Sequence, residues 1–94
     1  MLQLTTRAAE ILEQERANRG IPESFGLRVR QDHSDSKSML QLEFAEGPVP
    51  GDQVGEAEGV RLFVAADIAD VLAGQAIDAS ENSGLVVRDQ SDIA

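Results

Sequence analysis

The only histidine of the chain lies in a polar stretch between two apolar segments, with carboxylates on both sides of it. Asp32 precedes His33 directly, and Asp35 follows it by two residues. Imidazole and carboxylate groups together can ligate iron, zinc or another divalent metal. A stable site usually needs three or four protein ligands, and these are the three that lie together here. The sequence therefore predicts at most a metal site of Asp32, His33 and Asp35, and we prefer the competing interpretation of a solvated loop.

Two arginines precede this stretch. Arg28 and Arg30 alternate with Leu27 and Val29, so in a strand they share one face. Glu43 lies in the following apolar segment, which can return beside the first. We expect a cross-strand ion pair. The alternative is a site for an anion.

A group of acidic residues follows, with Arg61 as the basic residue among them: Glu46, Asp52, Glu56, Glu58, Asp67 and Asp70. Acid–base catalysis by paired carboxylates would need a pocket and shifted pKa values, so we interpret the group as a solvated acidic face. The chain shows no Ser–His–Asp order, phosphate-binding glycine loop or dinucleotide fingerprint. We therefore expect a protein that is not an enzyme.

Composition limits the partners. The 94 residues include 17 acidic and 8 basic ones, for a net charge of −9, which disfavours nucleic acid and anionic membrane surfaces. The chain contains no cysteine, so disulfides, thiol catalysis and cysteine-ligated iron–sulfur clusters are excluded. No apolar run reaches the roughly 18–20 residues of a membrane span, and the first residues do not form a secretory signal. The expected location is the cytoplasm.

The first third of the chain predicts a strand and a helix. Leu2 and Leu4 flank a polar residue, as in a short edge strand. Thr5 is a suitable N-cap for a helix over Thr6–Asn18, and Gly20 supplies the left-handed position after it. We expect Arg16 on the solvent-facing side of this helix, paired weakly with a glutamate one turn earlier.

Two hairpins follow. Gly26–Arg30 and Met39–Phe44 are strands with alternating apolar residues, joined by a polar loop over Gln31–Ser38. Gln53–Glu58 and Val60–Ala65 are the strands of the second hairpin, which turns at Glu58 and Gly59.

The last third predicts a short second helix over Ala66–Ala73, with Ile68, Val71 and Leu72 on one face. Extended segments follow at Ala76–Ala79 and Leu85–Arg88, and the remainder is polar and expected to fray. Strands clustered around two separate helices favour an α+β fold: one domain over residues 1–94, with small mixed β-sheets, an N-terminal helix and a short second helix.

Over nearly its whole length the chain resembles the HesB-like domain of A-type iron–sulfur cluster carrier proteins. Four stretches carry the resemblance: LQLTTRAAEIL as the opening strand, cap and helix; LRVRQ with LQLEF as the central hairpin; GVRLFVAADIADVLAGQAIDA as the strand, short helix and Ile-Asp segment; and GLVVRDQ as the closing strand. The resemblance implies the HesB-like fold.

The chemistry of that family lies in three cysteines, one in a Gly-Cys-Ser-Gly loop of the central hairpin and two in a C-terminal Cys-Gly-Cys-Gly tail. Counting back from LEF, the loop cysteine corresponds to Asp35, and its glycine neighbours correspond to Ser34 and Lys37. The tail pair has no counterpart before Ala94. Thiolates hold the iron, so the resemblance implies the fold without the cysteine-ligated cluster.

The sequence thus leads to one main hypothesis and two alternatives. The main one is a non-enzymatic HesB-like domain protein, a binding, interaction or regulatory relative of iron–sulfur cluster assembly proteins, with a protein partner and no cofactor. The first alternative is a carrier of iron or another divalent metal through Asp32, His33 and Asp35. The second is a dimerisation module, because the family tends to self-associate and so implies a homodimer.

Overall fold

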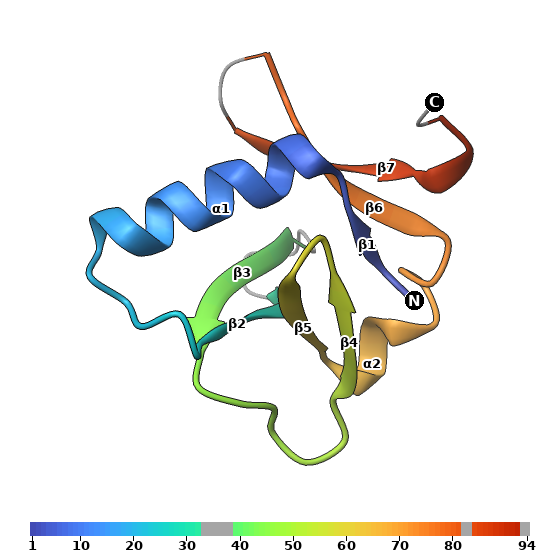
Figure 1. Ribbon diagram of the computed structural model, residues 1–94. Coiled ribbons are helices and arrows are strands. Elements are labelled where there is room, and N and C mark those ends of the chain that lie inside the picture. Colours follow the sequence, from blue (N-terminus) through green and yellow to red (C-terminus); the bar gives the residue numbers. More distant parts are fainter. Residues whose placement is uncertain (33–38, 82–83, 93–94) are drawn as a thin grey trace.

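Two small sheets and two helices make up the fold. The computed structural model describes residues 1–32, 39–81 and 84–92 (Figure 1). Its elements are β1 (Gln3–Leu4), α1 (Thr6–Asn18), β2 (Gly26–Asp32), β3 (Met39–Ala45), β4 (Gln53–Ala57), β5 (Val60–Val64), α2 (Ala66–Ala69), β6 (Gln75–Ala79), β7 (Leu85–Asp89) and a 3-10 turn over Gln90–Asp92. This arrangement confirms the predicted α+β class.

The larger sheet has four strands in the order β3-β2-β5-β4. β2 is antiparallel to β3 and parallel to β5, and β4 is antiparallel to β5. β3 and β4 follow each other in the chain but lie at opposite edges of the sheet. Residues 46–52 therefore have to carry the chain from one edge to the other, and they form the yellow-green loop at the bottom of Figure 1.

The smaller sheet has three strands in the order β1-β6-β7. β1 is parallel to β6, with Gln3 opposite Ala76 and Leu4 opposite Ile77, and β6 is antiparallel to β7. The predicted edge strand at Leu2–Leu4 is therefore confirmed, with bounds of Gln3–Leu4. α1 packs against β6.

The core forms where apolar residues of both sheets and both helices meet. Its buried leucine, isoleucine and valine residues are Leu2, Leu4, Leu12, Leu27, Val29, Val60, Leu62, Val64, Ile68, Leu72 and Ile77. Leu40, Leu42 and Phe44 of β3 are half-buried against it. The alternating apolar residues of the central hairpin thus pack in or against the core, as predicted.

The signals at the ends of α1 behave as predicted, whereas Arg16 does not. The Thr5 hydroxyl accepts a hydrogen bond from Ala8 N–H at 3.2 Å, and Gly20 has φ +67°. Arg16 donates to Glu13 at 3.1 Å, but its side chain is only 12 % exposed. Its Nη1 donates at 2.6 Å to the carbonyl oxygen of Ile21, in the segment that turns back beneath the helix. The prediction of a solvent-facing Arg16 was wrong because that turn covers it.

Three predicted boundaries also change. α2 ends at Ala69, and turns take the chain onward, so Val71 is 74 % exposed while Leu72 is buried. β2 continues to Asp32, two residues into the predicted loop, because its ladder with β3 extends to the pair Asp32–Met39. The segment after β7 is held as a 3-10 turn, in which Gln90 donates from its side chain to three carbonyl oxygens.

Gly26 occupies a position at which a side chain would collide with its neighbours. A Cβ at Gly26 would lie 2.7 Å from the ring of Phe63 and 2.9 Å from the carbonyl oxygen of Arg61. The Arg61 guanidinium covers the same ring at 5.7 Å from its centre. The close approach of β2 to β5 therefore depends on glycine.

We expect Gly26→Ala to lower the free energy of unfolding by about 1–3 kcal/mol, because the ring and the backbone must shift. Gly47→Ala is the matched control, since its Cβ would meet no atom within 4 Å; we expect an effect within about 0.5 kcal/mol. Denaturant unfolding of both variants measures this. Equal stability of the two would contradict the close packing.

Candidate functional site

Of the three predicted metal ligands, the structure describes Asp32 alone. Asp32 is the last residue of β2 and pairs through its backbone with Met39. His33 and Asp35 lie outside the described residues. Within the described ranges, no group of three or more histidine, aspartate or glutamate side chains could hold a metal ion. A metal site of Asp32, His33 and Asp35 therefore stays a prediction.

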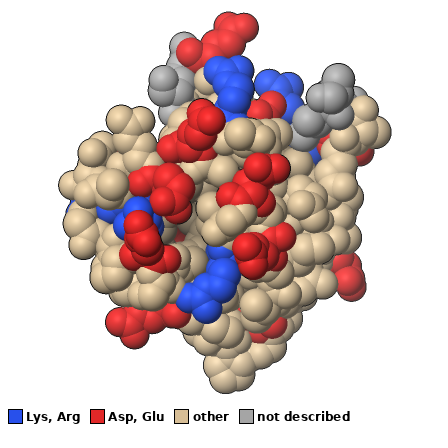
Figure 2. Space-filling model, viewed as in Figure 1, with Lys and Arg blue, Asp and Glu red and all other residues tan. Residues whose placement is uncertain are grey.

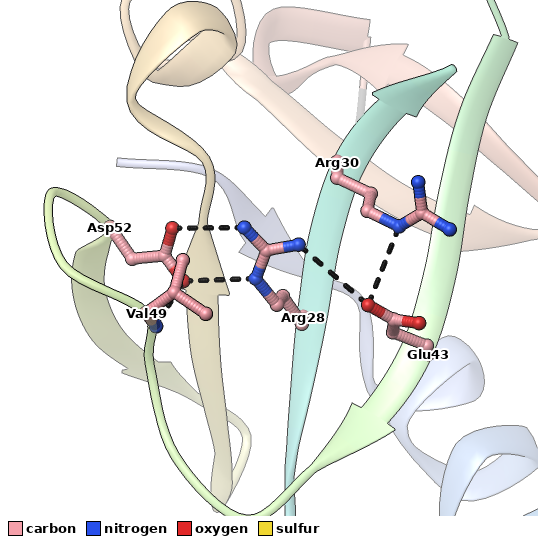
Figure 3. A network of polar contacts seen from close by, with 5 residues as sticks. All are labelled: Arg28, Arg30, Glu43, Val49 and Asp52. Atoms are coloured by element: carbon pink, nitrogen blue, oxygen red, sulfur yellow. Dashed lines mark hydrogen bonds and ion pairs between the residues drawn. The ribbon is translucent and has the colours of Figure 1, made fainter.

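Charged side chains form a network across the larger sheet (Figure 3). Arg28 binds Asp52 with two nitrogens, at 3.1 Å from Nε to Oδ2 and 3.3 Å from Nη2 to Oδ1. Its Nη1 lies 3.7 Å from Glu43, which is directly opposite on β3, and Arg30 Nε lies 3.4 Å from the same carboxylate. The predicted cross-strand ion pair is confirmed.

Asp52 is the member of this network that sequence reasoning missed. Its side chain is 2 % exposed, and its Oδ2 also accepts a hydrogen bond from Val49 N–H at 3.0 Å. It is therefore an internal anchor, and interpreting it as part of a solvated acidic face was wrong. No local pattern could have revealed this, because Arg28 and Asp52 meet only through the crossing of residues 46–52.

The same contacts decide between the ion pair and the anion site. The hydrogen bond that Arg28 donates to Asp52, supported by the charges of Asp52 and Glu43, raises the pKa of Arg28 above its ordinary value, although burial acts in the opposite direction. Arg28 is 16 % exposed, and carboxylates already occupy its donors. The described geometry favours the structural role over binding of a free anion.

A second polar cluster joins α1 to the smaller sheet. The Thr5 hydroxyl donates to Asp78 Oδ1 at 2.7 Å, Ala79 N–H donates to the same oxygen at 2.8 Å, and Arg88 Nε lies 3.2 Å from Asp78 Oδ2. The hydrogen bond from Thr5, followed by that from Ala79, lowers the pKa of Asp78 below its ordinary value of 3.8. The N-cap of the helix is thus tied to β6.

A pocket opens beside this cluster, with a volume of about 370 Å³. Its lining comes from β1, the start of α1, the turn between β4 and β5, β6 and the 3-10 turn: Gln3, Leu4, Thr5, Thr6, Glu58, Ala76 and Gln90. The sequence predicts three of these residues in other roles: Leu4 in an edge strand, Thr5 as a helix cap, and Glu58 in a hairpin turn and on a solvated acidic face.

Comparison with known proteins identifies the fold. No family model matches the chain, and no curated protein matches it significantly. The α+β fold matches that of the solved structures of IscA and SufA, as the resemblance predicted. A crystal structure of IscA with the [2Fe-2S] cluster matches with a TM-score of 0.76 and 24 % identity, over 94 % of this chain and 82 % of that one.

Two further solved structures show the same fold. Escherichia coli SufA, involved in the biosynthesis of iron–sulfur clusters, matches with a TM-score of 0.71 and 22 % identity, over 95 % of this chain and 85 % of SufA. A protein from Aquifex aeolicus, solved by NMR in solution, also gives 0.71 and 22 %, over 92 % of this chain and 88 % of that one. In the part of the chain that the structure describes, no helix is both long and apolar enough to cross a membrane.

We expect Asp52→Asn to lower the free energy of unfolding by about 2–3 kcal/mol, because the shielded Arg28 loses its charged partner. Glu43→Gln removes a charge from the same network at a carboxylate that is 48 % exposed, so we expect less than about 1 kcal/mol. Denaturant unfolding compares them. Equal losses of unfolding free energy in the two variants would show that Asp52 stabilises the fold no more than the exposed Glu43 does.

The lowered pKa of Asp78 predicts that the free energy of unfolding depends on pH. Because its pKa is lowered in the folded state, its contribution is complete above the ordinary value and is lost as the pH falls through the lowered value. Asp78→Asn lacks this contribution. The difference in unfolding free energy between the two proteins should be constant from about pH 7 to 5 and shrink below about pH 4. A constant difference down to about pH 2 would contradict the assignment.

Proposed function

We propose that the chain is a non-enzymatic binding or regulatory protein related to iron–sulfur cluster assembly proteins, and that it does not ligate a cluster through cysteine. One observation carries this proposal: a fold shared with IscA and SufA is built from 94 residues that include no cysteine. Aspartate stands at position 35, where the resemblance places the loop cysteine.

Coordination chemistry supports the separation of fold from cluster binding. Iron–sulfur clusters are held mainly by thiolates. Two of the described carboxylates are held in contacts within the fold, Asp52 with Arg28 and Asp78 with Thr5 and Arg88. What remains for function is the surface of the fold, which favours a protein partner over a bound cluster.

Anaerobic reconstitution with iron and sulfide tests the proposal, with IscA treated in parallel as the positive control. We expect the chain to stay colourless after desalting while IscA gains visible absorption, because no thiolate is present to hold the iron. A stoichiometric chromophore on the chain would overturn the proposal.

Metal titration tests the alternative of a site at Asp32, His33 and Asp35. Binding of Fe(II) or Zn(II) would stabilise the folded chain by about 2.7 kcal/mol at 100-fold excess over Kd. We expect no such shift in thermal unfolding. A shift that disappears in His33→Ala would favour the metal carrier instead.

The interaction role is tested with the tagged full chain in its native host, where we expect a cytoplasmic location. Recovery of a stoichiometric protein that the tag alone does not retain would support it, and recovery of none would count against it. Sedimentation at several concentrations separates a partner of another kind from a second copy of this chain, the homodimer that the resemblance implies.

A further inference from the structure

The proposed function does not account for the pocket beside the N-terminus of α1. The pocket is lined by Gln3, Leu4, Thr5, Thr6, Glu58, Ala76 and Gln90. It lies where the edge strand of the smaller sheet meets the turn of the second hairpin. Its volume of about 370 Å³ is within the range of roughly 300–1,000 Å³ that is usual for small-molecule sites. Leu4 and Ala76 are buried, so the pocket has an apolar floor under a polar rim.

Glu58 holds an unfavourable backbone conformation at this rim. It has φ +51°, and Gly59 has φ +79°, in the two-residue turn between β4 and β5. Such turns favour Asn-Gly, because a residue with a longer side chain is strained there by about 1 kcal/mol or more. The carboxylate is exposed and makes no ion pair or hydrogen bond with any residue of the described ranges. Its place in the turn is therefore not explained by stability.

Three of the four side-chain donor groups that line the pocket, those of Gln3, Thr5 and Gln90, are already engaged, and the fourth is the Thr6 hydroxyl. Gln90 Nε2 donates to the carbonyl oxygens of Gln75 at 2.9 Å, Met1 at 3.2 Å and Ala73 at 3.4 Å. Gln3 Nε2 donates to Met1 at 3.4 Å, and the Thr5 hydroxyl donates to Asp78. The amide oxygens of both glutamines accept no hydrogen bond from the described residues. The rim therefore offers mainly acceptors, namely two amide oxygens and one carboxylate, beside the Thr6 hydroxyl, which can donate or accept.

We propose that this pocket binds a small molecule through a primary ammonium group, whose N–H donors meet the Glu58 carboxylate and the two amide oxygens. The net charge of −9 favours the approach of a cation, and acidic side chains are spread over the face seen in Figure 2. The first turn of α1 acts in the opposite sense, because its free N–H groups favour an anion. A full carboxylate charge outweighs that partial charge of roughly one half.

The test is an NMR titration of the full chain with three probes: butylammonium, butyrate, which is close to it in size, and the larger lysine. We expect saturable shifts of the backbone amides of Thr6, Glu58, Gly59 and Ala76 with either ammonium probe and none with butyrate. Absence of saturable shifts with both ammonium probes, or the same shifts with butyrate, would overturn the proposal.

Two variants and a matched control localise the effect. Glu58→Gln removes the charge at nearly constant size and should weaken ammonium binding about tenfold or more. Asparagine suits this turn, so we expect Glu58→Asn to raise the midpoint of thermal unfolding. We also expect it to weaken ammonium binding. A variant that is more stable but binds less well separates the role of Glu58 in binding from its effect on folding. Glu56→Gln removes a carboxylate from β4 outside the pocket and should leave binding within about twofold. Equal binding by Glu58→Gln and Glu56→Gln would contradict the assigned role of Glu58.

Discussion

The ion pair between Arg28 and Asp52 fixes the path on which the larger sheet depends. Its two edge strands, β3 and β4, are consecutive in the chain, so residues 46–52 must cross between the edges. This connection contains two prolines and two glycines and makes little regular structure of its own. Asp52 holds its far end to the middle of β2, immediately before β4 begins to pair with β5. One shielded contact thus sets where the last strand of the sheet starts.

The smaller sheet depends on a contact of the same kind. Thr5 caps α1 and donates to Asp78, so one hydroxyl joins the helix, the end of β1 and β6. In both sheets a carboxylate receives donors from a distant part of the chain. Part of the negative charge of the protein therefore serves to hold the fold together, because Asp52 and Asp78 form ion pairs between segments of the chain. The exposed carboxylates are left to determine what the surface attracts.

Local signals account for the elements that the sequence predicted correctly. Thr5 and Gly20 bound α1, alternating apolar residues define the central hairpin, and Glu58 with Gly59 forms the turn of the second one. The missed features depend on how the chain returns on itself, which no local pattern shows. The anchoring role of Asp52 requires the crossing connection. The burial of Arg16 requires a turn after the helix that brings the carbonyl oxygen of Ile21, five residues later, to its side chain. The pocket needs residues from both sheets, so no single stretch of sequence could indicate it.

The parallel pairing of β1 with β6 has a consequence for the order in which the chain becomes structured. It joins Gln3 to Ala76, whereas all strands of the larger sheet lie between Gly26 and Val64. Loop-closure entropy makes the distant pairing slower to form. The strands of the larger sheet can therefore pair before β1 reaches β6. A molecule in the pocket would contact β1, β6 and Gln90 together, so its binding would stabilise the pairing between strands that lie far apart in the chain.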